Sequence, residues 1–216
     1  MVSEMDVEQR QTRQNEGERC PTCGAELPAG SRFCAQCGRA LGAILAPKPS
    51  DVVTIVFIDL EGFSAFTSRE SEDAVRDLVR VFQWLVREQL ARHRGFEVKQ
   101  LGDGFMVAFA DVKRAVAFAV DTQSSVQGHP VASAVGIRAG INSGHAIREG
   151  DDFFGHTVNV ASRISVHATG GQVLVSEETH RLAGELDGLE FVDIGRYEFR
   201  GIPERHRLFE AVRREA

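Results

Sequence analysis

The sequence predicts an α+β domain whose strands and helices follow the order β-α-β-β-α-β, preceded by a small cysteine-rich module. Runs of β-branched residues of strand length alternate with segments whose apolar residues recur at helical spacing. A Gly-Asp-Gly turn joins two of the short strands. All four cysteines lie between residues 20 and 37, so none remains to cross-link the rest of the chain.

The first strand and the first helix have clear signals. Residues 52–58 form a β-branched run of the kind found in buried strands. Ser71 followed by Glu72 and Asp73 predicts a helix start, because the hydroxyl can cap the helix and the acids complement its dipole. Apolar residues then recur at helical spacing until Arg94-Gly95, which predicts the helix end.

Two short strands, a second helix and a further strand follow. Residues 96–101 and 105–109 predict strands on either side of the turn Gly102-Asp103-Gly104. Residues 112–126 predict a helix, and residues 135–141 predict a strand with alternating apolar positions. The complete order is that of a ferredoxin-like core.

A C-terminal extension follows this core. It predicts a loop entering a helix at 155–164, a strand at 172–175, a short helix at 177–183, and two strands between 191 and 212.

Asp59 and Asp103 are the most informative residues, because each follows an apolar run where an uncompensated carboxylate is costly. A right-handed β-α-β crossover makes the first two strands parallel, and the third strand returns antiparallel between them. Both aspartates therefore meet at one end of the sheet. Taken singly, Asp59 could be a strand-end cap and Asp103 a turn former. Together they predict a two-metal site for chemistry at a phosphate.

The cysteines follow the pattern C-x2-C-x10-C-x2-C and predict a zinc ribbon. Its ligands are Cys20, Cys23, Cys34 and Cys37, which would hold one structural Zn²⁺. A segment this short has too little apolar core to fold without the metal. Few basic residues accompany the cysteines, which favours docking to an unidentified regulatory partner over nucleic-acid binding.

Composition narrows the function classes. The net charge of −6 provides no general basic field for nucleic acid. No apolar run approaches the length of a membrane span, and the polar N-terminus has no signal-peptide core, so we expect a cytoplasmic protein. The expected organisation is a disordered tail (1–18), the zinc ribbon (19–40), a linker (41–51) and the main domain (52–216).

Between Thr54 and Val212 the sequence resembles the catalytic domain of class III nucleotidyl cyclases, the adenylate and guanylate cyclases. The resemblance rests on motifs in a fixed order: Phe57-Ile-Asp59-Leu-Glu-Gly-Phe63, Lys99-Gln-Leu-Gly-Asp103, Gly140-Ile-Asn-Ser-Gly144, Asp152-Phe-Phe-Gly-His-Thr-Val-Asn159-Val-Ala-Ser-Arg163, and Arg200-Gly201 followed by Arg207-Leu-Phe209.

This resemblance implies a set of metal and phosphate contacts. Asp59 and Asp103 would bind two Mg²⁺ or Mn²⁺ ions, and the Leu60 carbonyl would assist. The backbone of three consecutive residues would lie near the phosphates, namely Gly62, Phe63 and Ser64. Arg200 stands where many members have a lysine that holds the terminal phosphates.

It also implies residues for the base, the ribose and the transition state. Lys99 would donate to adenine N1 and Asp152 would accept from the N6 amine, although the neighbouring Asp151 offers a one-residue alternative. Guanylate cyclases carry Glu and Cys-type residues at these two places. Asn159 would orient the ribose, and Arg163 would stabilise charge on the α-phosphate.

The expected activity is conversion of ATP to cyclic AMP and pyrophosphate. Family members place the metal aspartates on one subunit and the base-reading, asparagine and arginine residues on the other, so a chain that carries both halves implies a head-to-tail homodimer with an inactive monomer. Other functions remain open: a catalytically silent nucleotide-binding or regulatory domain, a guanylate cyclase, a diguanylate cyclase sharing the same core, and a zinc-ribbon nucleic-acid binder. His145 follows Gly144 where some relatives have a phosphate-binding arginine, and we assign it no role.

Overall fold

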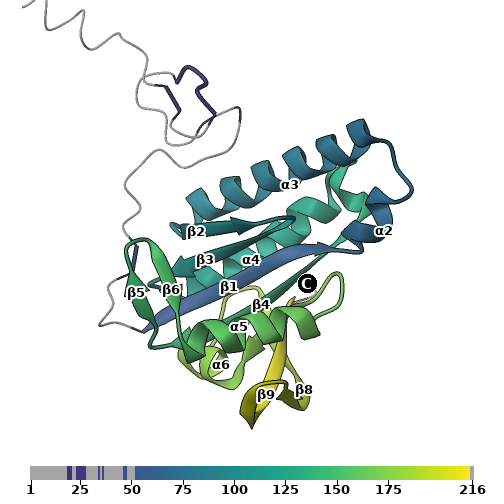
Figure 1. Cartoon of the computed structure of the whole chain (residues 1–216). Coiled ribbons are helices and arrows are strands. Elements are labelled where there is room, and N and C mark those ends of the chain that lie inside the picture. Colours follow the sequence, from purple (N-terminus) through teal and green to yellow (C-terminus); the bar gives the residue numbers. More distant parts are fainter. Residues whose placement is uncertain are drawn as a thin grey trace, which may run out of the picture.

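The main domain is built on one seven-stranded sheet in the order β2-β3-β1-β4-β7-β9-β8 (Figure 1). This computed structural model describes residues 19–20, 23–27, 34, 36, 46–47 and 52–214. The strands of the sheet are β1 (Val53–Glu61), β2 (Phe96–Leu101), β3 (Gly104–Phe109), β4 (Gly136–Gly144), β7 (Val173–Ser176), β8 (Leu189–Phe199) and β9 (Ile202–Arg213). A separate hairpin contains β5 (Ile147–Glu149) and β6 (Asp152–Phe154). The helices are α2 (Phe63–Thr67), α3 (Glu72–Arg92), α4 (Val112–Gln127), α5 (His156–His167) and α6 (Glu177–Ala183).

The first four strands confirm the predicted ferredoxin-like core. β1 is antiparallel to both β3 and β4, and β3 lies between β1 and β2. The turn between β2 and β3 therefore lies at the same end of the sheet as the C-terminal part of β1. Ser71 caps α3 as predicted, because its side chain accepts a hydrogen bond from the Ala74 amide.

The C-terminal extension continues the same sheet, as expected. β7 joins β4 in parallel, β9 joins β7 antiparallel, and β8 pairs with β9 to form the edge. The β8–β9 hairpin turns at Arg200-Gly201, where Gly201 has a φ of 81°.

Three details differ from the sequence-based expectation. β1 continues to Glu61, because β4 pairs with it up to that residue, so Asp59 lies inside the strand and not at its end. The short helix α2 and the β5–β6 hairpin were not predicted. Strands of three residues are too short for an alternating pattern to show, and α2 has no buried residue to create a periodic signal.

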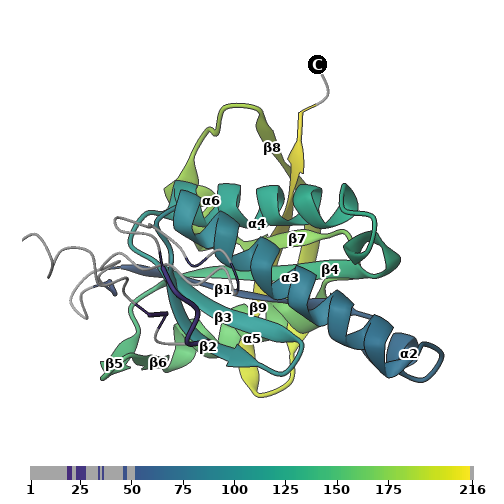
Figure 2. The same ribbon diagram turned by 90° about the horizontal axis from the view of Figure 1, so that it is seen from above.

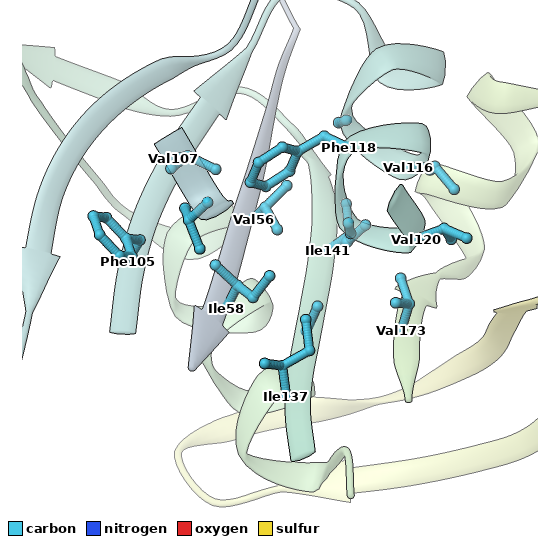
Figure 3. Packing of buried hydrophobic residues seen from close by; sticks show 14 of the residues in the cluster. Val56, Ile58, Phe105, Val107, Val116, Phe118, Val120, Ile137, Ile141 and Val173 are labelled. Carbon is cyan, nitrogen blue, oxygen red and sulfur yellow. The ribbon is translucent and has the colours of Figure 1, made fainter. Parts of the chain in front are cut away.

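Helices cover the sheet on both faces. α3 and α4 pack on one face and α5 packs on the other (Figures 1 and 2). Figure 3 shows the first layer, in which strand residues meet one side of α4. The labelled members of this core are Val56, Ile58, Phe105, Val107, Val116, Phe118, Val120, Ile137, Ile141 and Val173. Burying each large apolar side chain of this kind contributes about 1.5–3 kcal/mol.

Alternation along β1 decides which face the site occupies. Val56 and Ile58 point into the α3–α4 layer, whereas Ile55 and Phe57 belong to the apolar cluster under α5. Asp59 follows Phe57 by two positions and therefore lies on the α5 face.

The predicted tail (1–18) and most of the linker (41–51) lie outside the described residues. In the module between the tail and the linker, the Cys20 amide donates to the Ala25 carbonyl and the Gly24 amide donates to the Cys20 carbonyl, both at 2.8 Å. No helix within the described ranges is both long and apolar enough to cross a membrane.

Candidate functional site

The two aspartates come together across the pairing of β1 with β3. Asp59 stands opposite Gly104, the residue that follows Asp103 in the β2–β3 turn. A Cβ atom on Gly104 would lie only 2.7 Å from the Asp59 Cβ and 2.8 Å from the Ile58 carbonyl oxygen. Glycine is therefore required here for the turn to approach β1, and this approach places Asp103 beside Asp59.

Arg138 on β4 is a member of this cluster that sequence reasoning missed. Its Nε donates to Asp59 Oδ1 at 2.7 Å and its Nη2 donates to Oδ2 at 3.2 Å. The two side chains are 26% and 29% exposed, so the pair is partly shielded from water. The apolar alternation of β4 contained the signal, because Ile137 and Ala139 face the α3–α4 core and leave Arg138 on the Asp59 face.

Arg138 lies in the field of three carboxylates. Hydrogen bonding to Asp59 is the largest cause that raises the pKa of Arg138, and burial opposes it. The nearby charges of Glu61 and Asp103 raise the pKa of Arg138 further. This end of the sheet is therefore an acidic site whose negative charge is partly balanced by the Arg138 guanidinium.

The same donor set fits Mg²⁺ or Mn²⁺, because both ions prefer carboxylate and carbonyl oxygens. The pairing of β3 with β1 ends opposite Asp59, so the backbone of Leu60 is paired with β4 alone. Assistance from the Leu60 carbonyl stays a prediction. Glu61 is held in another way, since its carboxylate accepts a hydrogen bond from the Gly170 amide. Any ion at Asp59 would compete with the Arg138 guanidinium for the carboxylate oxygens.

The segment expected near the phosphates begins α2. Gly62 has a φ of 75°, a left-handed conformation that favours glycine, and it forms the N-cap of the helix. No side chain caps this end. The first amides of a helix, here those of Phe63 and Ser64, have no acceptor within the helix. Their contact with a phosphate stays a prediction.

Lys99 on β2 and Asp152 on β6 form a close ion pair. Lys99 Nζ lies 2.8 Å from Oδ1 and 2.6 Å from Oδ2 of Asp152. The hydrogen bond from Lys99 is the largest cause that lowers the pKa of Asp152, and the Phe153 amide adds to it. Asp151 instead lies 3.4 Å from Arg148 and is exposed. Of the two adjacent acids, Asp152 is therefore the partner of Lys99.

The sheet register places this ion pair on the same face as Asp59. Lys99 stands opposite Met106, and Met106 stands opposite Phe57. Lys99 is thus two strands and two residues away from Asp59, or about 12 Å from strand spacing and rise. One face of the sheet carries both the acidic end and the Lys99–Asp152 pair.

Asn159 and Arg163 are exposed on one side of α5, four residues apart. Within the described part of the chain, neither side chain has a hydrogen-bond or ion-pair partner, so neither is bonded to Asp59 or Asp103. α5 packs very tightly on β4, since a Cβ on Gly140 would lie 2.0 Å from the Ser165 amide nitrogen. The helix therefore has little freedom to approach or leave the sheet.

Arg200 and the cysteines complete the predicted residues. Arg200 is exposed in the β8–β9 turn, and no ion pair of the described residues includes it. Cys20 and Cys34 are buried and Cys23 is exposed, with the three sulfur atoms within 4.8 Å of one another. Cys37 lies outside the described residues.

The sulfur geometry fits zinc. Cys23 Sγ lies 3.6 Å from Cys34 Sγ. Four thiolates around a tetrahedral Zn²⁺ with bonds of about 2.3 Å would be about 3.8 Å apart. A disulfide would bring the two sulfur atoms to about 2.05 Å. The spacing therefore matches shared coordination of one metal ion and not a covalent cross-link.

Comparison with known proteins finds relatives and solved structures that are similar to this chain. An adenylate cyclase of Mycosarcoma maydis is 31% identical over 191 residues, which covers 76% of this chain but 7% of that protein. The structure of adenylate cyclases from Trypanosoma brucei in their monomeric state covers 79% of this chain and 94% of its own, with a TM-score of 0.72 and 24% identity. The guanylate cyclase domain of RhGC from Catenaria anguillulae, solved in complex with GTP, covers 76% and 98%, with a TM-score of 0.66 and 21% identity.

Two family profiles match the chain. One is the zinc-ribbon domain, over residues 19–41, and the other is the adenylate and guanylate cyclase catalytic domain, over residues 45–210. The second match covers most of the chain and includes both aspartates, the Lys99–Asp152 pair and α5. The chain therefore belongs to the class III adenylate and guanylate cyclase family and carries a zinc-ribbon domain in front of its cyclase domain.

Proposed function

We propose that this protein is an adenylate cyclase that converts ATP to cyclic AMP and pyrophosphate. The observation that carries the proposal is the ion pair between Lys99 and Asp152 on the site face of the sheet. It offers an ammonium donor beside a carboxylate acceptor. Adenine presents the complementary groups on one edge, an acceptor at N1 and a donor at the N6 amine. The base would enter between the two side chains and replace each partner's hydrogen bond with one to adenine.

The acidic end would handle the triphosphate. Asp59, Asp103 and the Leu60 carbonyl would hold two divalent ions, Mg²⁺ or Mn²⁺. Such ions lower the pKa of the ribose 3′-hydroxyl and neutralise charge on the phosphates. The 3′-hydroxyl would lose its proton to water, and its oxygen would bond to the α-phosphorus as the bond from that phosphorus to the pyrophosphate oxygen breaks. The Gly62–Ser64 backbone and Arg200 would bind the departing phosphates.

Asn159 and Arg163, with the base-reading Lys99 and Asp152, would act from one subunit on a substrate whose phosphates are held by the metal aspartates of the other. Asn159 and Arg163 are exposed on α5 with no partner in the described residues of their own chain. Asn159 would orient the ribose, and Arg163 would stabilise the charge that develops on the α-phosphate. A head-to-tail homodimer would bring this helix face onto the acidic end of its neighbour, which gives two shared sites and an inactive monomer.

The zinc ribbon would be a separate module with one structural Zn²⁺. Its three described sulfur atoms are spaced for tetrahedral coordination. We propose that it docks a regulatory partner of this enzyme.

The test is incubation of the purified full chain with Mn²⁺ and either ATP or GTP, with products identified by mass. Cyclic AMP from ATP alone is the expected result. Cyclic GMP from GTP would replace the proposal with a guanylate cyclase, the activity named for one of the related structures. A folded and dimeric protein that makes neither product would instead be a silent nucleotide-binding or regulatory domain, for which the arginine at position 200 is the one supporting feature.

A further inference from the structure

A second group of metal-ligating side chains lies away from the acidic end, where α5 meets β9. It contains His156, Glu204 and His206, and each offers one ligand atom within 4.8 Å of the other two. His156 is the first residue of α5 and follows Gly155, whose φ is 111°. Glu204 and His206 are two positions apart near the start of β9, and Glu204 lies at an irregularity in the pairing of β9 with β8.

The His206 ring packs against two other aromatic rings, which restricts its movement. Its ring stacks on Phe199 at 5.8 Å between centroids, and the ring of His156 lies 6.2 Å away. The Nε2 atom of His206 is buried and has no hydrogen-bond partner among the residues that the structure describes. Buried polar atoms nearly always have a hydrogen-bond partner, so we expect this nitrogen to bind a group that the described residues do not supply.

The electrostatics favour a neutral imidazole there. Burial is the largest cause that lowers the pKa of His206, and the neighbouring His156 lowers it further. Glu204 acts in the opposite direction. The neutral imidazole is the form that keeps a lone pair available to bind a metal ion.

We propose that His156, Glu204 and His206 form a binding site for a first-row transition-metal ion, with Zn²⁺ as the expected occupant. Two histidines and one glutamate are an established three-ligand set for Zn²⁺, which leaves a fourth position for water. Mg²⁺ prefers oxygen ligands and would not compete well. Ligand atoms around Zn²⁺ at about 2.1 Å would be about 3.4 Å apart. Since His156 and Glu204 are exposed, side-chain rotation can close the remaining gap.

The proposed site lies where a bound ion would restrain α5. His156 precedes Asn159 by three residues and Arg163 by seven, so all three lie on one side of the helix. β9 begins just after the turn that contains Arg200. A bound ion would tie the helix to the β8–β9 hairpin. Metal binding itself does not depend on the proposed cyclase activity and can be tested apart from it.

The test is a titration of the full chain with Co²⁺, followed by visible absorption. The ribbon is first filled with Zn²⁺, and excess Mg²⁺ is present so that the carboxylate site is occupied. We expect one further equivalent of Co²⁺ to bind. Its spectrum should show nitrogen and oxygen ligation and no thiolate charge-transfer absorption. His156→Asn and Glu204→Gln each change an exposed side chain, and each is expected to weaken this binding by at least about tenfold, the loss that even an outer-sphere change causes. His145→Asn changes an exposed histidine outside the group and is the control.

Two results would overturn the proposal. One is the absence of any Co²⁺ equivalent beyond the ribbon and the carboxylate site. The other is equal affinity in the wild type, His156→Asn and Glu204→Gln, which would assign the extra ion to some other place. Circular dichroism of each variant checks that the fold is unchanged.

Discussion

Arg138 donates hydrogen bonds to both carboxylate oxygens of Asp59, at 2.7 and 3.2 Å, across neighbouring strands of the sheet. In the metal-free protein, the guanidinium balances part of the negative charge of the carboxylates at the acidic end. A divalent ion that binds Asp59 must share or displace these hydrogen bonds. Arg138 therefore links the stability of the metal-free protein to its affinity for metal.

Replacement of Arg138 by glutamine should expose this link. Asp59 would lose a charged partner in a site less than one third exposed, which we expect to lower the free energy of unfolding by about 1–3 kcal/mol in EDTA. Mn²⁺ should then stabilise the variant more than the wild type, because the ion no longer competes with a guanidinium. Thermal unfolding with and without Mn²⁺ measures both effects.

Arg205→Gln is the matched control for this prediction. Arg205 pairs with Glu198, but both side chains are about two-thirds exposed, and such surface pairs contribute about 0–1 kcal/mol. We expect a small change that Mn²⁺ does not alter. Equal stabilisation of wild type and Arg138→Gln by Mn²⁺ would show that Arg138 and the ion do not compete.

The Lys99–Asp152 pair should be visible in a pH titration. Because Lys99 lowers the pKa of Asp152 below its usual 3.8, the ion pair is fully formed above that pH and is lost as pH falls through the lowered value. Lys99→Met removes the donor, so the pKa of Asp152 should rise back towards 3.8 or above. Carboxyl ¹³C NMR follows Asp152 directly. This is a better readout than stability, since both side chains are over 40% exposed.

Lys113→Met provides the comparison for this titration. Lys113 donates to the Glu185 carbonyl, away from the site. The Asp152 curve should be unchanged in this variant. An Asp152 curve that is also unchanged in Lys99→Met would mean that the ion pair is not populated in solution.

The sequence predicted the core well because its signals are local. The Ser71 cap, the apolar spacing of α3 and the Gly-Asp-Gly turn each act within a few residues. The nearness of Asp59 and Asp103 then followed from the handedness of one crossover. The pairing of Lys99 with Asp152 was expected from resemblance, and the choice between Asp151 and Asp152 needed coordinates.

The missed features depend on contacts that local sequence patterns do not identify. Arg138 resembles a solvated strand residue until β4 is placed beside β1. The His156 and His206 pair joins a helix start to a distant strand, which no spacing rule connects. The β5–β6 hairpin is three residues long on each side and is formed largely by its turn at Gly150, whose φ is 60°.

Gly140 tests how strongly the position of α5 depends on one missing methyl group. In Gly140→Ala the new Cβ would meet the Ser165 backbone at 2.0–2.5 Å, where nothing can rotate aside. We expect α5 to shift from β4 and the free energy of unfolding to fall by about 3 kcal/mol or more. Urea denaturation measures the loss.

Gly128→Ala is the control, because the nearest atom to its new Cβ is the Ser124 carbonyl oxygen at 3.3 Å and its φ of −79° suits any residue. Its effect should be below about 1 kcal/mol. If both variants had wild-type stability, the close packing of α5 on β4 would be wrong.

Mixing two inactive variants tests whether the site is shared between subunits. Asp59→Ala removes a carboxylate from the acidic end, and Arg163→Ala removes the exposed arginine of α5. A heterodimer of the two would contain one site with both residues intact. Random pairing makes half of the dimers mixed, each with one of its two sites complete, so about a quarter of wild-type activity should return.

The control mixture is Asp59→Ala with Asp103→Ala. Because both aspartates belong to the same end of one sheet, every site in that heterodimer lacks a carboxylate, and no activity should return. Native mass spectrometry establishes that the mixed dimers have formed. Rescue in the first mixture alone can arise only if Asp59 of one chain and Arg163 of another act on the same ATP. Mixed dimers without rescue would place Asp59 and Arg163 of a single chain at one substrate, and the shared-site proposal would then be wrong.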